Sequence, residues 1–282
     1  MSNWDREYLA HKQEYLDLFD KCMQKDQEQN VEFLEESLKP LTDKKHIVAC
    51  QSGTDALRFA LQALGLGPGD EIMTTNFSWI STASCISMVG ATPVFCDIDP
   101  KTYHLSMHSV RRMYQPEVKA IVYPHLFGYM SDMKELLDFC KEKNIYLIED
   151  SAQSLGASLL GVKAGSIGDI STLSFNANKV IAGIAGGGAV CTNDKEQARI
   201  CKRLRKHGEN KILGYNSKML LMNAEFINFR LNRMKEWQKM RQDIAKQYDE
   251  QLREYVTLQP TTTSLDHNYH KYVIRVQNKK VR

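Results

Sequence analysis

The stretch Ile145-Tyr146-Leu147-Ile148-Glu149-Asp150-Ser151-Ala152-Gln153 places two carboxylates directly after a short apolar run. A run of this length, bounded by polar residues, is typical of a buried strand in a parallel sheet. Open α/β sheets bind their ligands beyond the carboxyl ends of the strands. We therefore expect Asp150 at a binding site, although an Asp in this position also fits the cap of a following helix.

On both sides of this run, short apolar segments alternate with helical patterns. The alternation predicts parallel strands joined by helices that cover both faces of a mostly parallel sheet. Strands are expected over residues 47–50, 71–75, 92–98, 120–123, 145–148, 171–175, 188–192 and 272–276. Helices are expected from Thr54, from Ser78 and over 132–143, and a long helical stretch is expected over about 225–255.

The pattern divides the chain into three predicted parts. Residues 1–40 are rich in Glu, Lys, Gln and Leu and predict one or two amphipathic helices with a polar break near residues 26–30. Residues 41–222 form the large α/β domain, and residues 223–282 begin a smaller C-terminal domain. The last apolar run, 272–276, lies near the end of the sequence, so we expect this second domain to be incomplete.

The composition is that of a soluble globular protein: of 282 residues, 43% are hydrophobic and 25% are charged. A net charge of +3 gives no reason to expect a nucleic-acid or membrane partner. The N-terminus lacks a signal-peptide pattern, and no apolar run reaches membrane-spanning length. Seven cysteines without a Cys-x-x-Cys pair favour reduced core residues over a disulfide framework or a metal site. These features predict a cytoplasmic protein without a bound metal.

A turn suited to an anion precedes the first helix of the α/β domain, at Ser52-Gly53-Thr54-Asp55. The N–H groups of Gly53, Thr54 and Asp55 would meet a phosphate at the start of this helix. The same residues also fit an ordinary helix cap.

Trp79 stands at the start of the next expected helix. Its ring could stack on a flat cofactor. Taken alone, a tryptophan here fits a core or interface position better.

Lys179 is the only lysine in residues 166–192, and its neighbours Val180, Ile181 and Ile184 are apolar. Burial among them would lower the pKa of the amine and leave more of it uncharged for attack on an aldehyde. Asp150 could keep a pyridine nitrogen protonated, which is the partner that pyridoxal phosphate needs. Together these residues predict pyridoxal phosphate bound to Lys179 as a Schiff base; the alternative for Lys179 alone is a surface position in a flexible loop.

Five motifs resemble, in order, those of the DegT/DnrJ/EryC1/StrS family of sugar aminotransferases. They are Ser-Gly-Thr-Asp-Ala-Leu (52–57), Gly-Ala-Thr-Pro-Val-Phe (90–95), Glu-Asp-Ser-Ala-Gln-Ser-Leu-Gly-Ala (149–157), Gly-Asp-Ile-Ser-Thr-Leu-Ser-Phe (168–175) and the stretch 179–188. The resemblance extends from about Ile47 to at least Val276. It implies the fold of the fold-type I pyridoxal-phosphate enzymes, with a small C-terminal domain that continues further in relatives.

The resemblance also implies how the cofactor phosphate is held. Gly53, Thr54 and Ser174 would contact it within one subunit. The segment 214–219 resembles a loop that reaches into the neighbouring subunit, where Asn216 would contact the partner's phosphate. A functional homodimer follows from this; without the resemblance, Asn216 fits an ordinary turn.

For the cofactor ring, the resemblance implies four contacts. Trp79 would stack on the pyridine ring, Asp150 would pair with its nitrogen, and Gln153 would contact its phenolic oxygen. Lys179 would form the Schiff base and then move a proton as base and acid. Lys179 and Asp150 are thus the expected catalytic residues.

The implied reaction is transamination. An amino acid, most often glutamate in this family, would convert the cofactor to pyridoxamine phosphate (PMP), and a keto group on a nucleotide-linked sugar would then take the amine. Such a reaction belongs to amino-sugar biosynthesis for a surface polysaccharide or a glycosylated product.

Three alternatives remain beside this interpretation. Keto-sugar dehydratases on the same fold replace the Schiff-base lysine by histidine, and Lys179 argues against them. A non-catalytic protein that binds cofactor or sugar is the second alternative. The third is a different pyridoxal-phosphate enzyme, for example one that acts on small amino acids.

Overall fold

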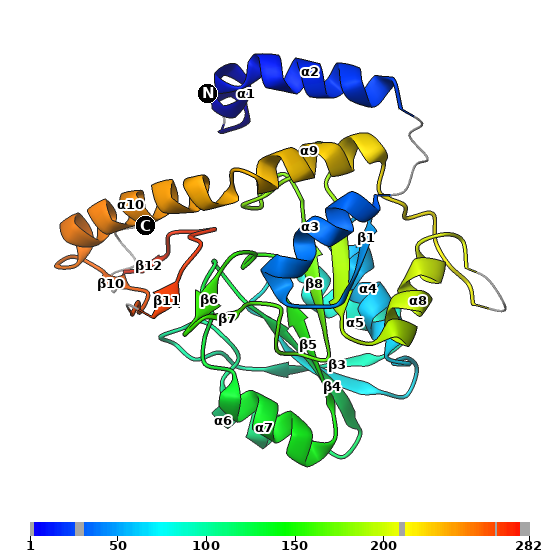
Figure 1. Ribbon diagram of the computed structural model, residues 1–282. Helices are drawn as coiled ribbons and strands as arrows, with labels where there is room; N and C mark the ends of the chain where they lie inside the picture. The colour runs from blue at the N-terminus through cyan, green and yellow to red at the C-terminus, as the bar shows by residue number, and fades with distance from the viewer. Residues whose placement is uncertain (1–2, 26–30, 209–211, 263, 277–282) are drawn as a thin grey trace.

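A seven-stranded sheet forms the centre of the computed structural model, which describes residues 3–25, 31–208, 212–262 and 264–276 (Figure 1). The strand order is β1-β9-β8-β5-β4-β2-β3. Its strands are β1 (His46–Cys50), β2 (Glu71–Thr75), β3 (Thr92–Cys96), β4 (Val118–Pro124), β5 (Tyr146–Asp150), β8 (Ile170–Ser174) and β9 (Gly188–Thr192). Only β9 runs against its neighbours in this sheet, β1 and β8. The mostly parallel sheet predicted from the sequence is confirmed, with each of these strands within a few residues of its expected bounds.

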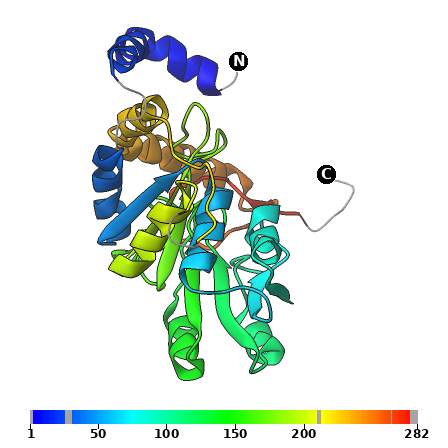
Figure 2. The ribbon, with the colours of Figure 1, turned by 90° about the vertical axis from the view of Figure 1, so that its right-hand side faces the viewer.

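Helices cover both faces of the sheet (Figure 2). One face carries α4 (Gly53–Ala63), α5 (Ile80–Met88) and α8 (Lys195–Leu204). The other carries α3 (Glu32–Thr42), α6 (Met107–Met113), α7 (Lys134–Lys143) and α9 (Leu221–Leu231). Along β1, Val48 and Cys50 join the core under α4, whereas Ile47 and Ala49 join the core under α3 and α9. Burial on both faces explains why the strands are continuous apolar runs.

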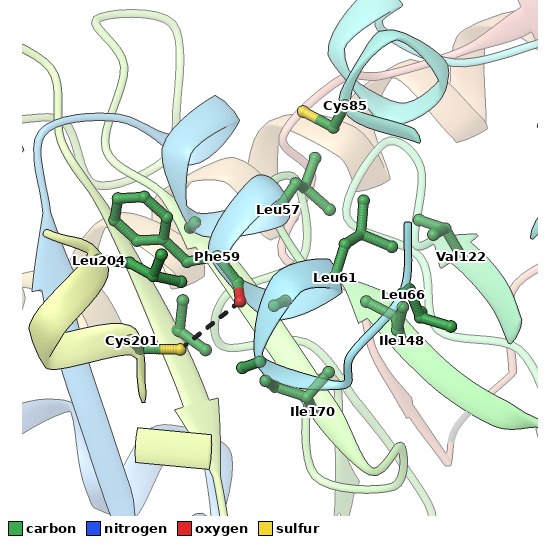
Figure 3. Close-up of a cluster of buried hydrophobic side chains, with 14 of the residues drawn as sticks. Leu57, Phe59, Leu61, Leu66, Cys85, Val122, Ile148, Ile170, Cys201 and Leu204 are labelled. Carbon is green, nitrogen blue, oxygen red and sulfur yellow. Dashed lines mark hydrogen bonds between the residues drawn. The ribbon is translucent and has the colours of Figure 1, made fainter. Parts of the chain in front are cut away.

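The core under α4 fixes the helix whose first turn faces the predicted site. In Figure 3 Phe59 of α4 lies beside Leu204 of α8, and the Cys201 thiol donates a weak hydrogen bond to the Phe59 carbonyl (3.7 Å). Each such buried Leu or Phe contributes roughly 1.5–3 kcal/mol through apolar burial. All seven cysteines are buried, as predicted for core residues.

The long helical stretch expected over about 225–255 is helical in the structure, but it is divided into two helices, α9 and α10 (Met234–Leu252). At the break, the guanidinium of Arg233 donates to the Phe229 carbonyl (3.3 Å), which a continuous helix would pair with the Arg233 amide. That amide instead donates to the Arg230 carbonyl (3.0 Å), so the last turn of α9 tightens and the helix ends.

The N-terminal region contains α1 (Asn3–Ala10) and α2 (Lys12–Met23) ahead of α3, and α2 packs along α9 (Figure 1). The predicted polar break at 26–30 lies outside the described residues. Within the described ranges, no helix has the length and apolar character that a membrane crossing requires.

The end of the chain differs from expectation, because only Ile274–Arg275 of the predicted strand 272–276 is extended. The small strands here and beside α10 are β6 (Ser158–Leu159), β7 (Val162–Lys163), β10 (Thr257–Leu258), β11 (Leu265–Asp266) and β12 (Ile274–Arg275). Sequence patterns had not indicated these short pairings or α6. The division of the chain at residues 40 and 222 stays a prediction.

Candidate functional site

A cavity of about 440 Å³ opens at the edge of the sheet where β1, β2, β4, β5 and β8 end. Because these strands are parallel, the segments that follow them meet at this edge. Seven of the eight predicted site residues line the cavity: Gly53, Thr54, Trp79, Asp150, Gln153, Ser174 and Lys179. The structure thus brings together residues that are spread along the sequence from Gly53 to Lys179.

The predicted phosphate turn lies at the N-terminus of α4. Ser52 caps this helix, and its hydroxyl accepts from the Asp55 amide (3.0 Å). Our expectation that the Asp55 amide would meet an anion is therefore wrong, since the cap already uses it. The first turn still leaves the amides of Gly53 and Thr54, together with the positive end of the helix dipole.

Gly53 lies directly against Ser174, the other predicted phosphate residue. A Cβ added at Gly53 would stand 2.8 Å from the Ser174 Cβ and 2.9 Å from its hydroxyl oxygen, closer than real side chains approach. Glycine is therefore required where α4 begins beside the end of β8. On the other side, the Thr54 hydroxyl lies 2.9 Å from the hydroxyl of Ser81, which also lines the cavity. Backbone amides and three hydroxyl groups gathered in this way suit a phosphate.

Asp150 ends β5 with only 7% of its surface exposed. One carboxylate oxygen accepts from the Thr82 hydroxyl (3.0 Å) and the other from the Ala152 amide (3.2 Å). The Thr82 hydroxyl lies 2.9 Å from that of Ser78, so α5 and the segment before it orient the carboxylate. A fixed, nearly buried carboxylate in a cavity of this size suits a protonated ring nitrogen.

Glu149 lies on the opposite side of β5 because successive side chains of a strand alternate. It is fully buried and accepts from His125 (2.8 Å) and from the amides of Gly165, Ile167 and Gly168 (2.9, 2.7 and 2.6 Å). Burial alone would raise the pKa of Glu149, but His125 and these amides hold it below its ordinary value. The two adjacent acids therefore differ in role: Glu149 fixes the loop at 165–168, and Asp150 faces the cavity.

Replacing Glu149 by Gln is expected to lower the free energy of unfolding by about 3 kcal/mol, because a neutral amide cannot accept all four hydrogen bonds. The folded-state pKa lies below 4.5, so the stabilisation is complete above that pH and is lost as the pH falls through the folded-state pKa. Urea unfolding of both proteins across this pH range measures the difference, and a gap that stays constant into strong acid would contradict it. Glu135→Gln, at an exposed carboxylate, is the control and should change stability by less than about 0.5 kcal/mol.

Trp79 occupies the residue before α5 and is 69% exposed, so of the two alternatives, core or interface, the structure excludes only the core position. A large aromatic side chain on the cavity wall with most of its surface open can receive a flat ring.

Gln153 is held by the loop after β4. Its side-chain oxygen accepts from the Phe127 amide (2.8 Å). Because a backbone amide can only donate, this bond fixes which end of the Gln153 amide is the oxygen. The NH₂ group is then the end that can donate to a phenolic oxygen in the cavity.

Lys179 lies on the loop between β8 and β9, beside Asp150 and Lys271. Burial lowers the pKa of its amine, and the charge of Lys271 lowers it further, while Asp150 acts in the opposite direction. The net shift is downward, as the apolar neighbours predicted. An amine with this shift inside a cavity suits attack on an aldehyde.

Two cavity residues, His270 and Lys271, come from the C-terminal segment, which sequence reasoning did not place at the site. His270 Nε2 lies 2.9 Å from the Asn178 carbonyl and donates to it, next to Lys179, and His270 Nδ1 lies 3.2 Å from the Gln153 side-chain oxygen. Burial, with the charge of Lys179, lowers the pKa of His270 to about 4. His270 is therefore uncharged at neutral pH and carries its one proton on Nε2, so it holds the loop of Lys179 through the Asn178 carbonyl, while its unprotonated Nδ1 makes no hydrogen bond to the Gln153 oxygen.

The same segment is anchored through Asn268, which is fully buried. Its side-chain NH₂ group donates to the carbonyls of Gln153 and Leu155 (3.1 and 2.9 Å). Its backbone amide donates to the Gly128 carbonyl (3.1 Å). Only an aromatic and histidine-rich composition near 267–272 could have signalled this segment, and it carries no recognisable spacing.

Asn216 is the one predicted site residue that does not line the cavity. It is exposed on the segment that precedes α9 and forms a single bridge with Lys206. Next to it, Ser217 donates to the Asp55 carboxylate (2.7 Å), so the segment runs close to α4.

The DegT/DnrJ/EryC1/StrS aminotransferase family matches the chain over residues 10–282. A "pleiotropic regulatory protein" of Geobacillus stearothermophilus is 37% identical over 87% of this chain and 68% of its own length. The GDP-perosamine synthase of Caulobacter vibrioides is 36% identical over 74% of this chain and 58% of its own. The UDP-N-acetyl-3-dehydro-alpha-D-glucosamine 3-aminotransferase of Acidithiobacillus ferrooxidans is 35% identical over 86% of this chain and 68% of its own length. The chain thus spans 58% to 68% of the length of these curated relatives.

Solved structures share the fold. DesV of S. venezuelae, in complex with a ketimine intermediate, superposes with a TM-score of 0.93 at 27% identity, over 98% of this chain and 77% of DesV. NtdA of Bacillus subtilis, with bound cofactor PMP, superposes with a TM-score of 0.87 at 28% identity. The match covers 95% of this chain and 64% of NtdA. The expected fold of the fold-type I pyridoxal-phosphate enzymes is confirmed.

Proposed function

Because the chain belongs to the DegT/DnrJ/EryC1/StrS aminotransferase family, we propose that it is a pyridoxal-phosphate-dependent aminotransferase that acts on a nucleotide-linked keto-sugar. The observation that carries this proposal is the convergence of Lys179, Asp150 and the amino end of α4 on one cavity. The Caulobacter and Acidithiobacillus relatives, which are named for reactions of this type, support the sugar substrate.

The residues present fit the cofactor. Gly53, Thr54 and Ser174 would hold its phosphate, Trp79 would cover one face of its ring, and Gln153 would donate to its phenolic oxygen. Pyridoxal phosphate, when bound, supplies an aldehyde that captures amines and a ring that withdraws electrons from the carbon bearing the amine.

Lys179 and Asp150 are the catalytic residues of the proposal. The lowered pKa of Lys179 leaves its amine free of a proton for part of the time, so Nζ can attack a carbonyl and can also take up and return a proton at the substrate carbon. The Asp150 carboxylate would supply a fixed negative charge to the ring nitrogen of the cofactor. Its hydrogen bonds from Thr82 and Ala152 keep it in place during turnover.

Within this proposal, glutamate is the amino donor and the product is an amino sugar for a surface polysaccharide or a glycosylated product. The buried cysteines suit the reducing conditions of the cytoplasm, where we place the reaction. Lys179 disfavours the keto-sugar dehydratases of the same fold, in which histidine takes this position.

Spectroscopy of the purified protein tests the proposal. Glutamate should bleach the absorbance of the lysine-bound cofactor, and a keto-sugar carried on a nucleoside diphosphate should restore it. Cofactor that is bound but not changed by glutamate would instead favour a non-catalytic binding protein. That second candidate is suggested by the name of the Geobacillus relative.

The proposal includes a homodimer in which Asn216 contacts the partner's cofactor phosphate. In support, Asn216 is exposed, and the apolar side chains of Leu213 and Leu220 on either side of it are 89% and 53% exposed. Apolar side chains flanking a polar one on an open segment suit a subunit contact.

Mixing two inactive variants tests the shared site. Lys179→Ala and Asn216→Ala dimers should each be impaired, but subunit exchange between them creates one intact site in every mixed dimer. Activity should return to about a quarter of the native level in an equal mixture of symmetric dimers. If mixing restores nothing although mass spectrometry detects exchanged dimers, Asn216 acts within its own subunit or not at all.

A further inference from the structure

The loop that carries Lys179 is held from outside the cavity by one buried face of α9. Asn223 of α9 accepts from the Ala185 amide (3.2 Å) and donates to the Gly186 carbonyl (2.9 Å). Arg230, two turns further along α9, donates to the Ala182 carbonyl (2.6 Å). The backbone after Lys179 is thus fixed by two side chains of a helix that does not itself line the cavity.

The packing between this loop and α9 leaves no spare room. A Cβ added at Gly183 would stand 2.4 Å from the Asn223 side-chain oxygen and 2.2 Å from the Gly186 carbonyl oxygen. The position of the loop therefore follows the position of α9 closely.

Arg230 is a buried cation, 3% exposed, and its counter-ion comes from the N-terminal helices. Its guanidinium donates to both carboxylate oxygens of Glu7 in α1 (2.7 and 2.6 Å). Tyr15 of α2 stacks on Phe226 of α9, with ring centroids 5.3 Å apart, and its hydroxyl donates to Glu7. Burial raises the pKa of Tyr15 to about 12, so this hydroxyl keeps its proton.

We propose that Arg230, locked by Glu7 and Tyr15, is a positioning residue that sets the loop carrying Lys179, so that the N-terminal helices α1 and α2 support the active site. A bidentate carboxylate fixes the plane of the guanidinium, and the remaining Nη1 donor then points at the Ala182 carbonyl. The inference rests on the proposed function only in taking Lys179 as the reactive lysine.

The chain offers a matched control. Arg233 and Glu14 form a second ion pair between α2 and the end of α9, and Glu225 and Lys25 form a third (2.7 Å). The Arg233 guanidinium donates to the Glu14 carboxylate and to the Phe229 carbonyl, and neither bond involves the loop at 182–186. Loss of the Arg233 pair weakens the docking of α2 without removing the link from Glu7 to Ala182.

Hydrogen exchange of the cofactor-free protein tests the proposal. Arg230→Met should raise the exchange rate of amides in residues 176–187 by at least about tenfold, since it removes a hydrogen bond from a charged donor. Glu7→Gln should also raise the exchange rate of these amides, while the other two ion pairs keep the helices docked. This variant replaces Arg230→Met in the test if Arg230→Met does not fold. Glu14→Gln should leave this peptide unchanged. Unaltered exchange in both Arg230→Met and Glu7→Gln, or equal acceleration by Glu14→Gln, would overturn the proposal.

A second readout separates positioning from general stability. Acetylation of Lys179 as a function of pH, read by mass spectrometry, reports the protonation of its amine, which faces Asp150, Lys271 and His270. A looser loop admits water, so the midpoint should rise by about half to one pH unit in Arg230→Met. It should return toward the native value in Arg230→Lys, which keeps a donor, and stay native in Glu14→Gln. A midpoint that Arg230→Met does not move would contradict the positioning role.

Neither measurement uses cofactor or substrate. If wild-type Lys179 failed to bind pyridoxal phosphate covalently, the proposed function would be contradicted, but the exchange and acetylation results would remain valid.

Discussion

Lys179→Ala protein is expected to lose all covalent attachment of pyridoxal phosphate and at least about 10⁴-fold in turnover, because one side chain serves as nucleophile and as acid–base group. The amine of Lys179 has a lowered pKa inside the cavity, and no other lysine lies on its loop. Borohydride reduction followed by peptide mass spectrometry locates the attached cofactor, and single-turnover absorbance with glutamate measures the rate.

Lys271 provides the control, since it is the other lysine lining the same cavity. Lys271→Ala should still carry the reduced cofactor on Lys179. Covalent cofactor in Lys179→Ala, whether on Lys271 or elsewhere, would mean that the reactive lysine has been assigned wrongly.

Asp150→Asn protein is expected to bind the cofactor yet turn over about 10³-fold more slowly, because a neutral amide cannot hold a ring nitrogen in its protonated form. The Asn side chain keeps the size of Asp, its oxygen can accept from the Ala152 amide, and its NH₂ group can donate to the Thr82 hydroxyl, so the fold should be unaffected. Cofactor affinity and the rate of the glutamate half-reaction are measured separately, and only the rate should fall. A rate within tenfold of the native one would show that Asp150 does not act on the ring.

Thr82→Val tests the role of the Asp150 carboxylate without removing its charge. It removes the hydroxyl that donates to Asp150 but keeps the charge, so the loss should be about tenfold or less, as for one hydrogen bond. If Thr82→Val were as damaging as Asp150→Asn, the orientation of the carboxylate would matter more than its charge.

The features that the sequence predicted correctly are those set by contiguous residues. The apolar run before Glu149 and Asp150 predicted β5, and the parallel order of the strands then brought Gly53, Asp150 and Ser174 to one edge. Asp150 and Ser174 end β5 and β8, and Gly53 lies shortly after the end of β1, so the topology alone determines where they lie.

The features that the sequence missed depend on contacts between distant segments. His270 reaches the cavity because Asn268 binds carbonyls more than a hundred positions earlier, which no local pattern encodes. At the break between α9 and α10, the side chain of Arg233 binds the Phe229 carbonyl, a contact that the helical pattern of the sequence does not reveal. The Asp55 amide was misassigned because capping by Ser52 and anion binding draw on the same residues.

The reversed direction of β9 has a consequence for the order of folding. Ser174 pairs with Gly188, so the loop bearing Lys179 leaves and re-enters the sheet on adjacent strands and closes over a short span of chain. The pairing of β9 with β1 instead joins segments separated by most of the α/β unit. Because short loops close faster than long ones, the hairpin of β8 and β9 can form while β1 is still detached. We expect the reactive lysine to be among the first site groups to gain its local geometry, and the phosphate-binding wall after β1 to be added later.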